Sequence, residues 1–147
     1  MVFRGKVGYG TIRRMSTHIV IHLPVSDLTR SMAFYEALGF VKDAGCSDGS
    51  ACSLSWRHGI WIMLWTGEAY RRFVRGREVA DTRKTNAAIF GLSLESREAV
   101  EAFAETAKAH GGNYYRVDTD APEGAMAMYE VEDPDGHLWE PTWIERP

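Results

Sequence analysis

Apolar and polar residues alternate in two stretches of the chain, and each alternation is followed by apolar residues at helical spacing. The first alternation runs from Thr17 to Leu23 and the second from Ala87 to Leu94. After each one, a polar segment precedes an amphipathic helix that ends at a glycine, and further strands follow the helix. The pattern therefore predicts one βαβββ unit that is present twice.

The two predicted units cover about residues 17–66 and 87–144. In the first unit we expect strands at 18–23, 40–43, 51–56 and 60–65, with a helix at 27–38. In the second we expect strands at 87–94, 113–117, 126–132 and 138–143, with a helix at 97–110. A charged connector joins the units and has a helical turn near residues 68–75. The fold class is therefore α+β, with two related halves and a cavity expected between them.

The composition is that of a single globular domain that spans residues 16–147. The chain has 147 residues, of which 45% are hydrophobic, and this is enough to bury a core. A net charge of -3 argues against a nucleic-acid partner, because the domain lacks a basic surface. No apolar run is long enough for a signal peptide or a membrane span. We therefore expect neither a nucleic-acid nor a membrane partner.

The start of the chain and the cysteines suggest a cytoplasmic protein with a loose N-terminal arm over residues 1–15. The first 14 residues hold four basic and no acidic side chains. Met15 directly precedes the first strand, so translation could also begin there. Cys46 and Cys52 lie six apart around a turn and match no metal-binding spacing, so we expect free thiols in a reducing compartment.

The strand at 60–65 is apolar on both faces, with Trp61, Met63 and Trp65 on one of them. Such a strand is buried on both sides. The other face suits the core beneath the helix. Because ligand sites are mostly apolar with few polar groups, we expect the Trp/Met/Trp face to line the cavity.

Several motifs together carry a resemblance to a known family. They are Val25-Ser26-Asp27-Leu28, Phe34-Tyr35, Leu38-Gly39-Phe40 and Asp133-Pro134-Asp135-Gly136 with Glu140. In their order and spacing they resemble the glyoxalase / bleomycin-resistance / extradiol-dioxygenase (vicinal oxygen chelate) superfamily, within a branch labelled predicted lactoylglutathione lyase. The match covers residues 17–143. The resemblance implies that the two modules form a cup-shaped mixed sheet with helices on the outside, in a homodimer. His137, beside the Asp-Pro-Asp-Gly turn, is expected at the surface.

In the metal-using members of this superfamily, four side chains at the base of the cup hold a divalent ion. The resemblance assigns these positions here to Val20, Met63, Ile89 and Glu140. Zinc needs about three protein ligands even in an open catalytic site, and only Glu140 offers an oxygen donor. We therefore expect no metal or other cofactor at the usual position. A displaced divalent-metal site built from His18, His22 and Glu140 remains open, because the two histidines share a strand face with Val20.

Three functions follow from these observations. The leading hypothesis is a protein that binds a small organic molecule in a metal-free cup. The residues expected to contact the ligand are His22, Trp61, Met63, Trp65, Val20 and Ile89. An alternative is a glyoxalase- or dioxygenase-type enzyme that uses the displaced metal, or Glu140 as a general acid or base. Glu140 could equally have a structural role. In the third reading, the cup is filled by its own side chains.

The connector offers a further set of candidate ligand contacts. Its basic side chains could hold a carboxylate or phosphate, although charge runs are more often solvated. They are Arg71, Arg72, Arg75, Arg77, Arg83 and Lys84, interleaved with Tyr70 and Phe73.

Overall fold

The computed structural model describes residues 18–57 and 59–145, with the backbone alone at residues 44–47. The predicted N-terminal arm and the alternative start at Met15 lie outside these residues. The chain divides into two compact units, residues 1–79 and 80–147. Each unit holds one βαβββ module, and each module forms its own four-stranded sheet. The predicted α+β class is therefore confirmed.

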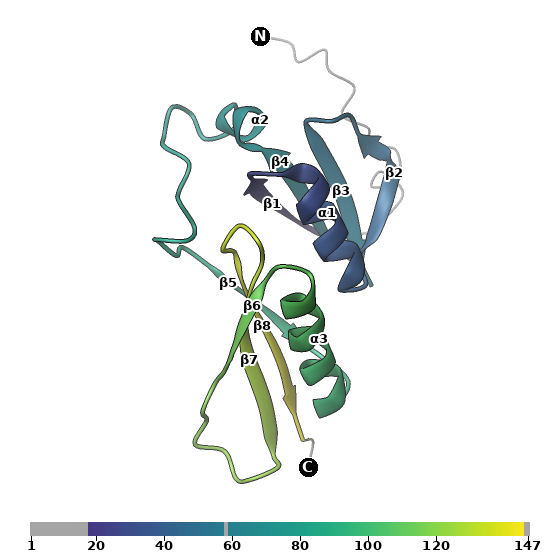
Figure 1. Cartoon of the computed structure of the whole chain (residues 1–147), viewed down its shortest axis with the longest axis vertical. Helices are drawn as coiled ribbons and strands as arrows, with labels where there is room; N and C mark the ends of the chain where they lie inside the picture. The colour runs from purple at the N-terminus through teal and green to yellow at the C-terminus, as the bar shows by residue number, and fades with distance from the viewer. Residues whose placement is uncertain (1–17, 58, 146–147) are drawn as a thin grey trace. The chain divides into compact units, whose positions relative to one another are not determined.

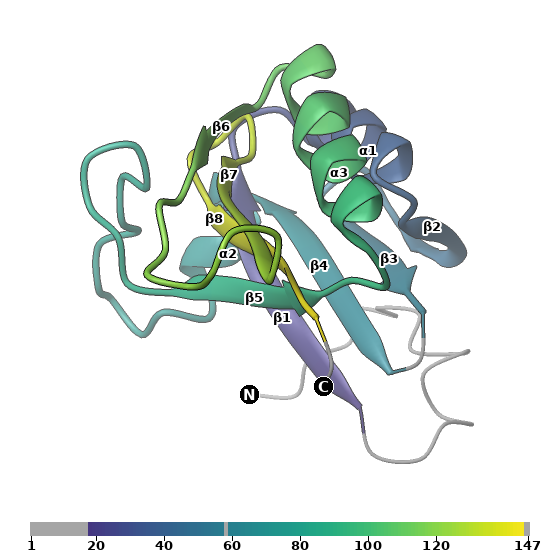
Figure 2. The same ribbon diagram turned by 90° about the horizontal axis from the view of Figure 1, so that it is seen from below.

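The first unit follows the predicted order of elements. They are β1 Ile19–Val25, α1 Leu28–Ala37, β2 Val41–Ser47, β3 Ala51–Trp56, β4 Ile60–Thr66 and α2 Gly67–Arg71. The sheet order is β1-β4-β3-β2, with β1 parallel to β4 and the other pairs antiparallel. Figure 2 shows β4 between β1 and β3. This central place explains why β4 is apolar on both faces.

Helix α1 covers one face of the first sheet (Figure 1). It begins at Asp27, whose carboxylate accepts a hydrogen bond from the Arg30 N–H at 3.0 Å and so satisfies one of the free amides of the first turn. It ends before Gly39, whose φ of +94° favours glycine. The buried layer between helix and sheet contains Phe34, Tyr35, Leu54, Ile62 and Leu64. This layer is the core of the first unit.

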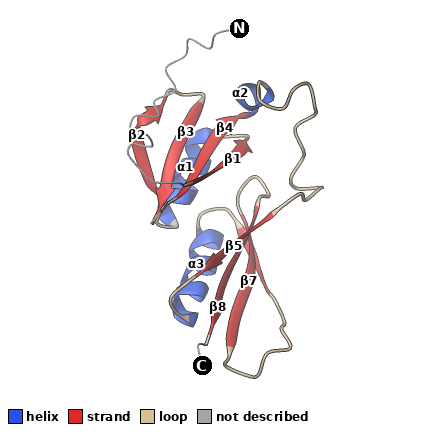
Figure 3. Cartoon of the chain, turned by 180° about the vertical axis from the view of Figure 1, so that it is seen from behind, coloured by secondary structure: helices blue, strands red, loops and turns tan. Residues whose placement is uncertain are grey.

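The second unit repeats the arrangement. Its elements are β5 Ile89–Ser93, α3 Arg97–Ala109, β6 Asn113–Arg116, β7 Met126–Glu132 and β8 Leu138–Ile144, in the sheet order β5-β8-β7-β6. Ser96 caps α3 by accepting a hydrogen bond from the Ala99 N–H at 3.1 Å. Helix α3 packs against β6, β7 and β8, and Figure 3 shows it beside β8. It buries Val100 and Phe103 against the sheet face that holds Trp139.

The Asp-Pro-Asp-Gly motif forms a closed turn between β7 and β8. The Asp133 carboxylate accepts hydrogen bonds from the N–H groups of Asp135 at 2.9 Å and His137 at 2.8 Å. Gly136 supplies the φ of +91° that the turn needs. His137 is only 7% exposed, so the expectation that it lies at the surface was wrong. The turn is tied to its surroundings, and this buries the histidine.

The end of the connector packs over this turn through Thr82 and Arg83. The Thr82 hydroxyl donates to the carbonyl oxygen of Asp135 at 2.6 Å, and the Arg83 guanidinium donates to that of Pro134 at 2.7 Å. A Cβ at Gly136 would lie 2.9 Å from the backbone carbonyl of Thr82. The motif is therefore a clasp that holds the connector against the second sheet, and only glycine leaves room for it.

The described residues also bear on the environment expected for the protein. Cys52 is fully buried in β3. The prediction for Cys46 concerns a side chain outside the described part. Over residues 18–57 and 59–145, no helix has the length and apolar content needed to cross a membrane.

Candidate functional site

The face of the first sheet opposite α1 carries most of the side chains that the sequence singled out. Three rows cross β1, β4 and β3 on this face: Val20 with Trp61 and Ser55, His22 with Met63 and Ser53, and Pro24 with Trp65 and Ala51. The aromatic side chains thus lie on one face, while Ile62 and Leu64 lie on the other beneath α1. We refer to the first of these as the aromatic face.

Helix α2 folds back over one end of the aromatic face. Its Ala69 packs into a buried cluster with Ala51, Met63 and Trp65, and the half-buried Val20 and Tyr70 pack against that cluster. Met63 has no exposed surface, and Trp61 and Trp65 are each 4% exposed. At this end, the chain's own side chains therefore cover the face.

The accessible rings at the edge of this cluster are His22 and Phe73, and both contact the buried Trp65. The His22 and Trp65 rings are nearly parallel, with centroids 5.9 Å apart and an interplanar angle of 10°. Phe73 lies 4.8 Å from Trp65 and 6.4 Å from His22, centroid to centroid, and is 50% exposed. We call these three residues the aromatic triad; its members His22 and Phe73 expose ring surface of the kind that binds flat organic molecules.

One polar contact fixes the triad. The indole Nε1–H of Trp65 donates a hydrogen bond to Nδ1 of His22 at 2.9 Å. Partial burial lowers the pKa of His22 below its usual value of 6.5 by penalising the charged ring. The imidazole is therefore held neutral at pH 7, with its orientation set by the indole.

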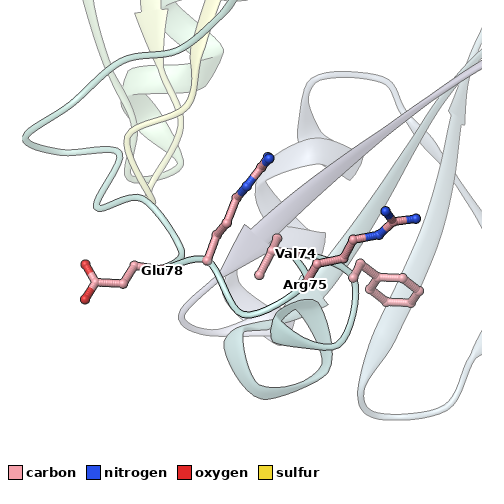
Figure 4. A pocket seen from close by; sticks show the side chains of 5 residues that line it. Val74, Arg75 and Glu78 are labelled. Atoms are coloured by element: carbon pink, nitrogen blue, oxygen red, sulfur yellow. The ribbon is translucent and has the colours of Figure 1, made fainter.

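Phe73 also borders a pocket of about 420 Å³ whose other lining residues are Val74, Arg75, Arg77 and Glu78. Figure 4 shows the Glu78 carboxylate pointing away from Val74 and Arg75. Two arginines and one glutamate line the pocket, so the guanidinium groups outnumber the carboxylate. Of the basic connector residues that the sequence offered, only these two line it. Arg83 instead binds a backbone carbonyl of the turn.

Two buried polar atoms of the aromatic face have no hydrogen-bond partner among the described residues. They are the Ser53 hydroxyl and the Trp61 indole N–H. Both side chains are over nine-tenths buried. Buried polar groups normally have a partner, in the protein or in ordered water. The aromatic face therefore retains unused hydrogen-bonding capacity.

The structure places the four positions assigned to a metal in equivalent places of the two sheets. In the first sheet, Met63 pairs with His22 of β1, and Val20 lies two residues before His22. In the second sheet, Glu140 pairs with Gly91 of β5, and Ile89 lies two residues before Gly91. Valine and isoleucine have no donor atom, and a methionine thioether is a poor ligand for a hard divalent ion. This donor set does not fit the usual metal.

The displaced metal site was built from residues that lie in different units. His18 precedes β1 and His22 lies within it, whereas Glu140 lies in β8 of the second unit. Within the described ranges, no three His, Cys, Asp or Glu side chains are grouped as metal ligands.

Glu140 itself lies on the face of the second sheet opposite α3 and is half-buried. Its carboxylate makes no hydrogen bond or ion pair with any described residue. Its partner across the parallel pair is Gly91, where an added Cβ would meet nothing within 4 Å. Ile89, two residues earlier, is 46% exposed. This face of the second unit is therefore open beside the carboxylate.

Sequence reasoning found the aromatic residues but missed how they are joined. The bond between His22 and Trp65 links residues 43 positions apart and left no local signal. Ser53 could have been found, because residues 51, 53 and 55 are small or polar and alternate on β3 with Cys52, Leu54 and Trp56. Phe73 was noted only as part of the connector.

Comparison with known proteins places the chain in a family. The model of the Glyoxalase/Bleomycin resistance protein/Dioxygenase superfamily matches residues 16–140. No curated protein matches the sequence.

Solved structures agree with this at the level of the fold. A glyoxalase/bleomycin resistance protein/dioxygenase family enzyme from Burkholderia phytofirmans is 15% identical, with a TM-score of 0.70 over 88% of this chain and 100% of that chain. A glyoxalase-related enzyme from Fulvimarina pelagi is 25% identical, with a TM-score of 0.69 over 88% of both chains. Hypothetical protein SA1046 from S. aureus is 20% identical, with a TM-score of 0.69 over 90% of this chain and 97% of that chain. With most of its length matched by the family model, the chain belongs to the glyoxalase/bleomycin resistance protein/dioxygenase superfamily.

Proposed function

We propose that this protein binds a small aromatic or amphipathic organic molecule at the aromatic triad and the adjoining pocket, without a metal ion. The observation that carries the proposal is the place of Phe73, which belongs to both the triad and the pocket. A half-exposed aromatic ring at the rim of an open pocket gives a flat ligand a stacking surface beside a recess.

The dimensions and chemistry of the surface support a ligand of this kind. A volume of about 420 Å³ is within the range of small-molecule sites. The half-exposed ring of Phe73 supplies apolar contact, and the exposed His22 lies beside it as a polar group. Arg75 and Arg77 favour a ligand that carries an acidic group, because guanidinium pairs well with carboxylate or phosphate.

Binding is proposed in preference to the lactoylglutathione lyase chemistry of the related branch. A Lewis-acid mechanism needs a resident divalent ion, and three of the four assigned positions carry valine, methionine and isoleucine. Glu140 alone could move a proton without a metal, and it is the one oxygen donor among the four assigned positions. Sequestration of a compound requires no such group.

The proposal is tested by titrating the protein with 2-naphthoate and 2-acetylnaphthalene, following the indole N–H signal of Trp65 by NMR. Phe73→Ala removes an exposed ring and leaves the core intact. An aromatic contact of ordinary strength predicts that this variant binds about fivefold more weakly than the wild type. Tyr115→Ala is the matched control, because Tyr115 is a 54% exposed aromatic residue of the second unit.

Failure of a diverse panel of aromatic compounds to bind would contradict the proposal. It would favour an aromatic face that is filled by its own side chains. Equal weakening by Phe73→Ala and Tyr115→Ala would place the binding surface elsewhere.

A further inference from the structure

The hydrogen bond between Trp65 and His22 determines where the imidazole carries its proton. An indole nitrogen donates and cannot accept. Because Trp65 Nε1 lies 2.9 Å from His22 Nδ1, that imidazole nitrogen must present its lone pair. The proton of the neutral ring is then on Nε2.

Among the described residues, no group accepts a hydrogen bond from the Nε2–H of His22. His22 is exposed, and within residues 18–57 and 59–145 its hydrogen bonding is confined to Nδ1. The hydrogen bond from Trp65 restricts rotation of the imidazole, and Phe73, which also lines the pocket, flanks it. The ring therefore offers one oriented donor beside an aromatic surface.

We propose that His22 donates its Nε2–H to an oxygen atom of the bound compound, and that Trp65 is the positioning residue that fixes the tautomer. This rests on the proposed function of the same surface and narrows its ligand class. The class is an aromatic compound with a carbonyl or carboxylate oxygen on or next to the ring. A compound of the same shape without an oxygen acceptor makes the stacking contacts and lacks this bond.

The neighbouring groups favour the same class. Partial burial lowers the pKa of His22, so the ring is a neutral donor at pH 7 and attracts the oxygen by hydrogen bonding rather than by charge. Arg75 and Arg77 at the pocket favour partial or full negative charge on the ligand. An oxygen conjugated to an aromatic ring accepts the hydrogen bond from His22 and carries the partial negative charge that the arginines favour.

The tautomer is tested first on the ligand-free protein by ¹⁵N NMR of the imidazole rings above pH 7. His22 is expected to show a protonated Nε2 and an unprotonated Nδ1. His110 provides an internal contrast, since its Nδ1 lies 2.8 Å from the carbonyl oxygen of Thr106 and must carry the proton there. Trp65→Phe removes the indole donor and is expected to return His22 to a mixture of tautomers. A proton on Nδ1 of His22 in the wild type would overturn the proposal.

The ligand class is tested with two probes of the same shape, 2-acetylnaphthalene and 2-isopropylnaphthalene, which differ in the carbonyl oxygen. One added hydrogen bond predicts that wild type prefers the ketone by about five- to tenfold. His22→Asn keeps an acceptor near Trp65 but loses the outer donor, so its preference is expected to fall to about one. His22→Gln restores an amide N–H at the reach of Nε2 and is expected to regain part of the preference. His110→Gln is the control and keeps the full preference.

The outcomes separate the two proposals. If both probes bind with equal affinity to wild type, the binding function stands and the donor role of His22 falls. If His22→Asn keeps the wild-type preference, the donor is another group and the inference is likewise overturned. If neither probe binds, the proposed function fails and the donor role fails with it.

Discussion

Substitution of Gly136 by alanine tests the clasp that the Asp-Pro-Asp-Gly turn forms with the connector. The φ of +91° at this position is unfavourable for alanine and costs about 1–2 kcal/mol of stability. The added Cβ would also lie 2.9 Å from the Thr82 carbonyl, so the connector must move. Movement breaks the hydrogen bonds from Thr82 and Arg83, which contribute about 0.5–1.5 kcal/mol each. The expected loss in the free energy of unfolding is about 2–5 kcal/mol.

Gly124→Ala provides the matched control in the same unit. Gly124 has a φ of +86°, and an added Cβ there meets nothing within 4 Å. This variant should therefore lose only the backbone term of about 1–2 kcal/mol. Urea unfolding followed by the fluorescence of Trp139 and Trp143 measures both losses. Equal losses in the two variants would refute the reasoning, because they would show that contact with the connector contributes nothing.

Three further predictions follow from particular side chains. Ser53→Ala removes a buried hydroxyl that has no hydrogen-bond partner among the described residues, so in urea unfolding it should cost less than Ser96→Ala, which loses a helix cap worth about 1 kcal/mol; a larger cost would reveal a partner. Folding lowers the pKa of His22 below 6.5, so the unfolded chain binds a proton there more readily than the folded chain does. The contribution of neutral His22 to the free energy of unfolding should therefore be complete above pH 6.5. It should decline as the pH falls from 6.5 through the lower folded pKa. A pH series of unfolding curves checks this, and His22→Asn should abolish that part of the slope. Glu140→Gln should leave binding of 2-acetylnaphthalene unchanged, and zinc, nickel, manganese or iron should not raise the melting temperature; an increase with any of them would revive the displaced metal site.

The sequence predicted the elements because their signals are local. The caps at Asp27 and Ser96 and the glycine after α1 set the ends of the helices within a residue or two of expectation. Alternation along β4 also predicted which face carries the tryptophans, because a strand has a fixed period of two. The order of the strands along the chain in the second unit followed from the repeat.

What the sequence could not predict depends on contacts between distant segments. His137 is buried because its turn is held by the connector, and a turn motif says nothing about what packs on it. No local pattern predicts where α2 packs either. It covers Met63 and leaves His22 and Phe73 accessible. The tautomer of His22 depends on an indole from another strand. The candidate site therefore lies at the edge of the Trp61, Met63 and Trp65 surface that the sequence predicted, because packing between distant segments covers the rest of that surface.

The most direct test of the central claim is the affinity for 2-acetylnaphthalene, measured by calorimetry on wild type and Phe73→Ala in the presence of a chelator. The account predicts that wild type binds without metal and that Phe73→Ala binds about fivefold more weakly. Absence of binding, or binding that appears only when a divalent metal is restored, would contradict it.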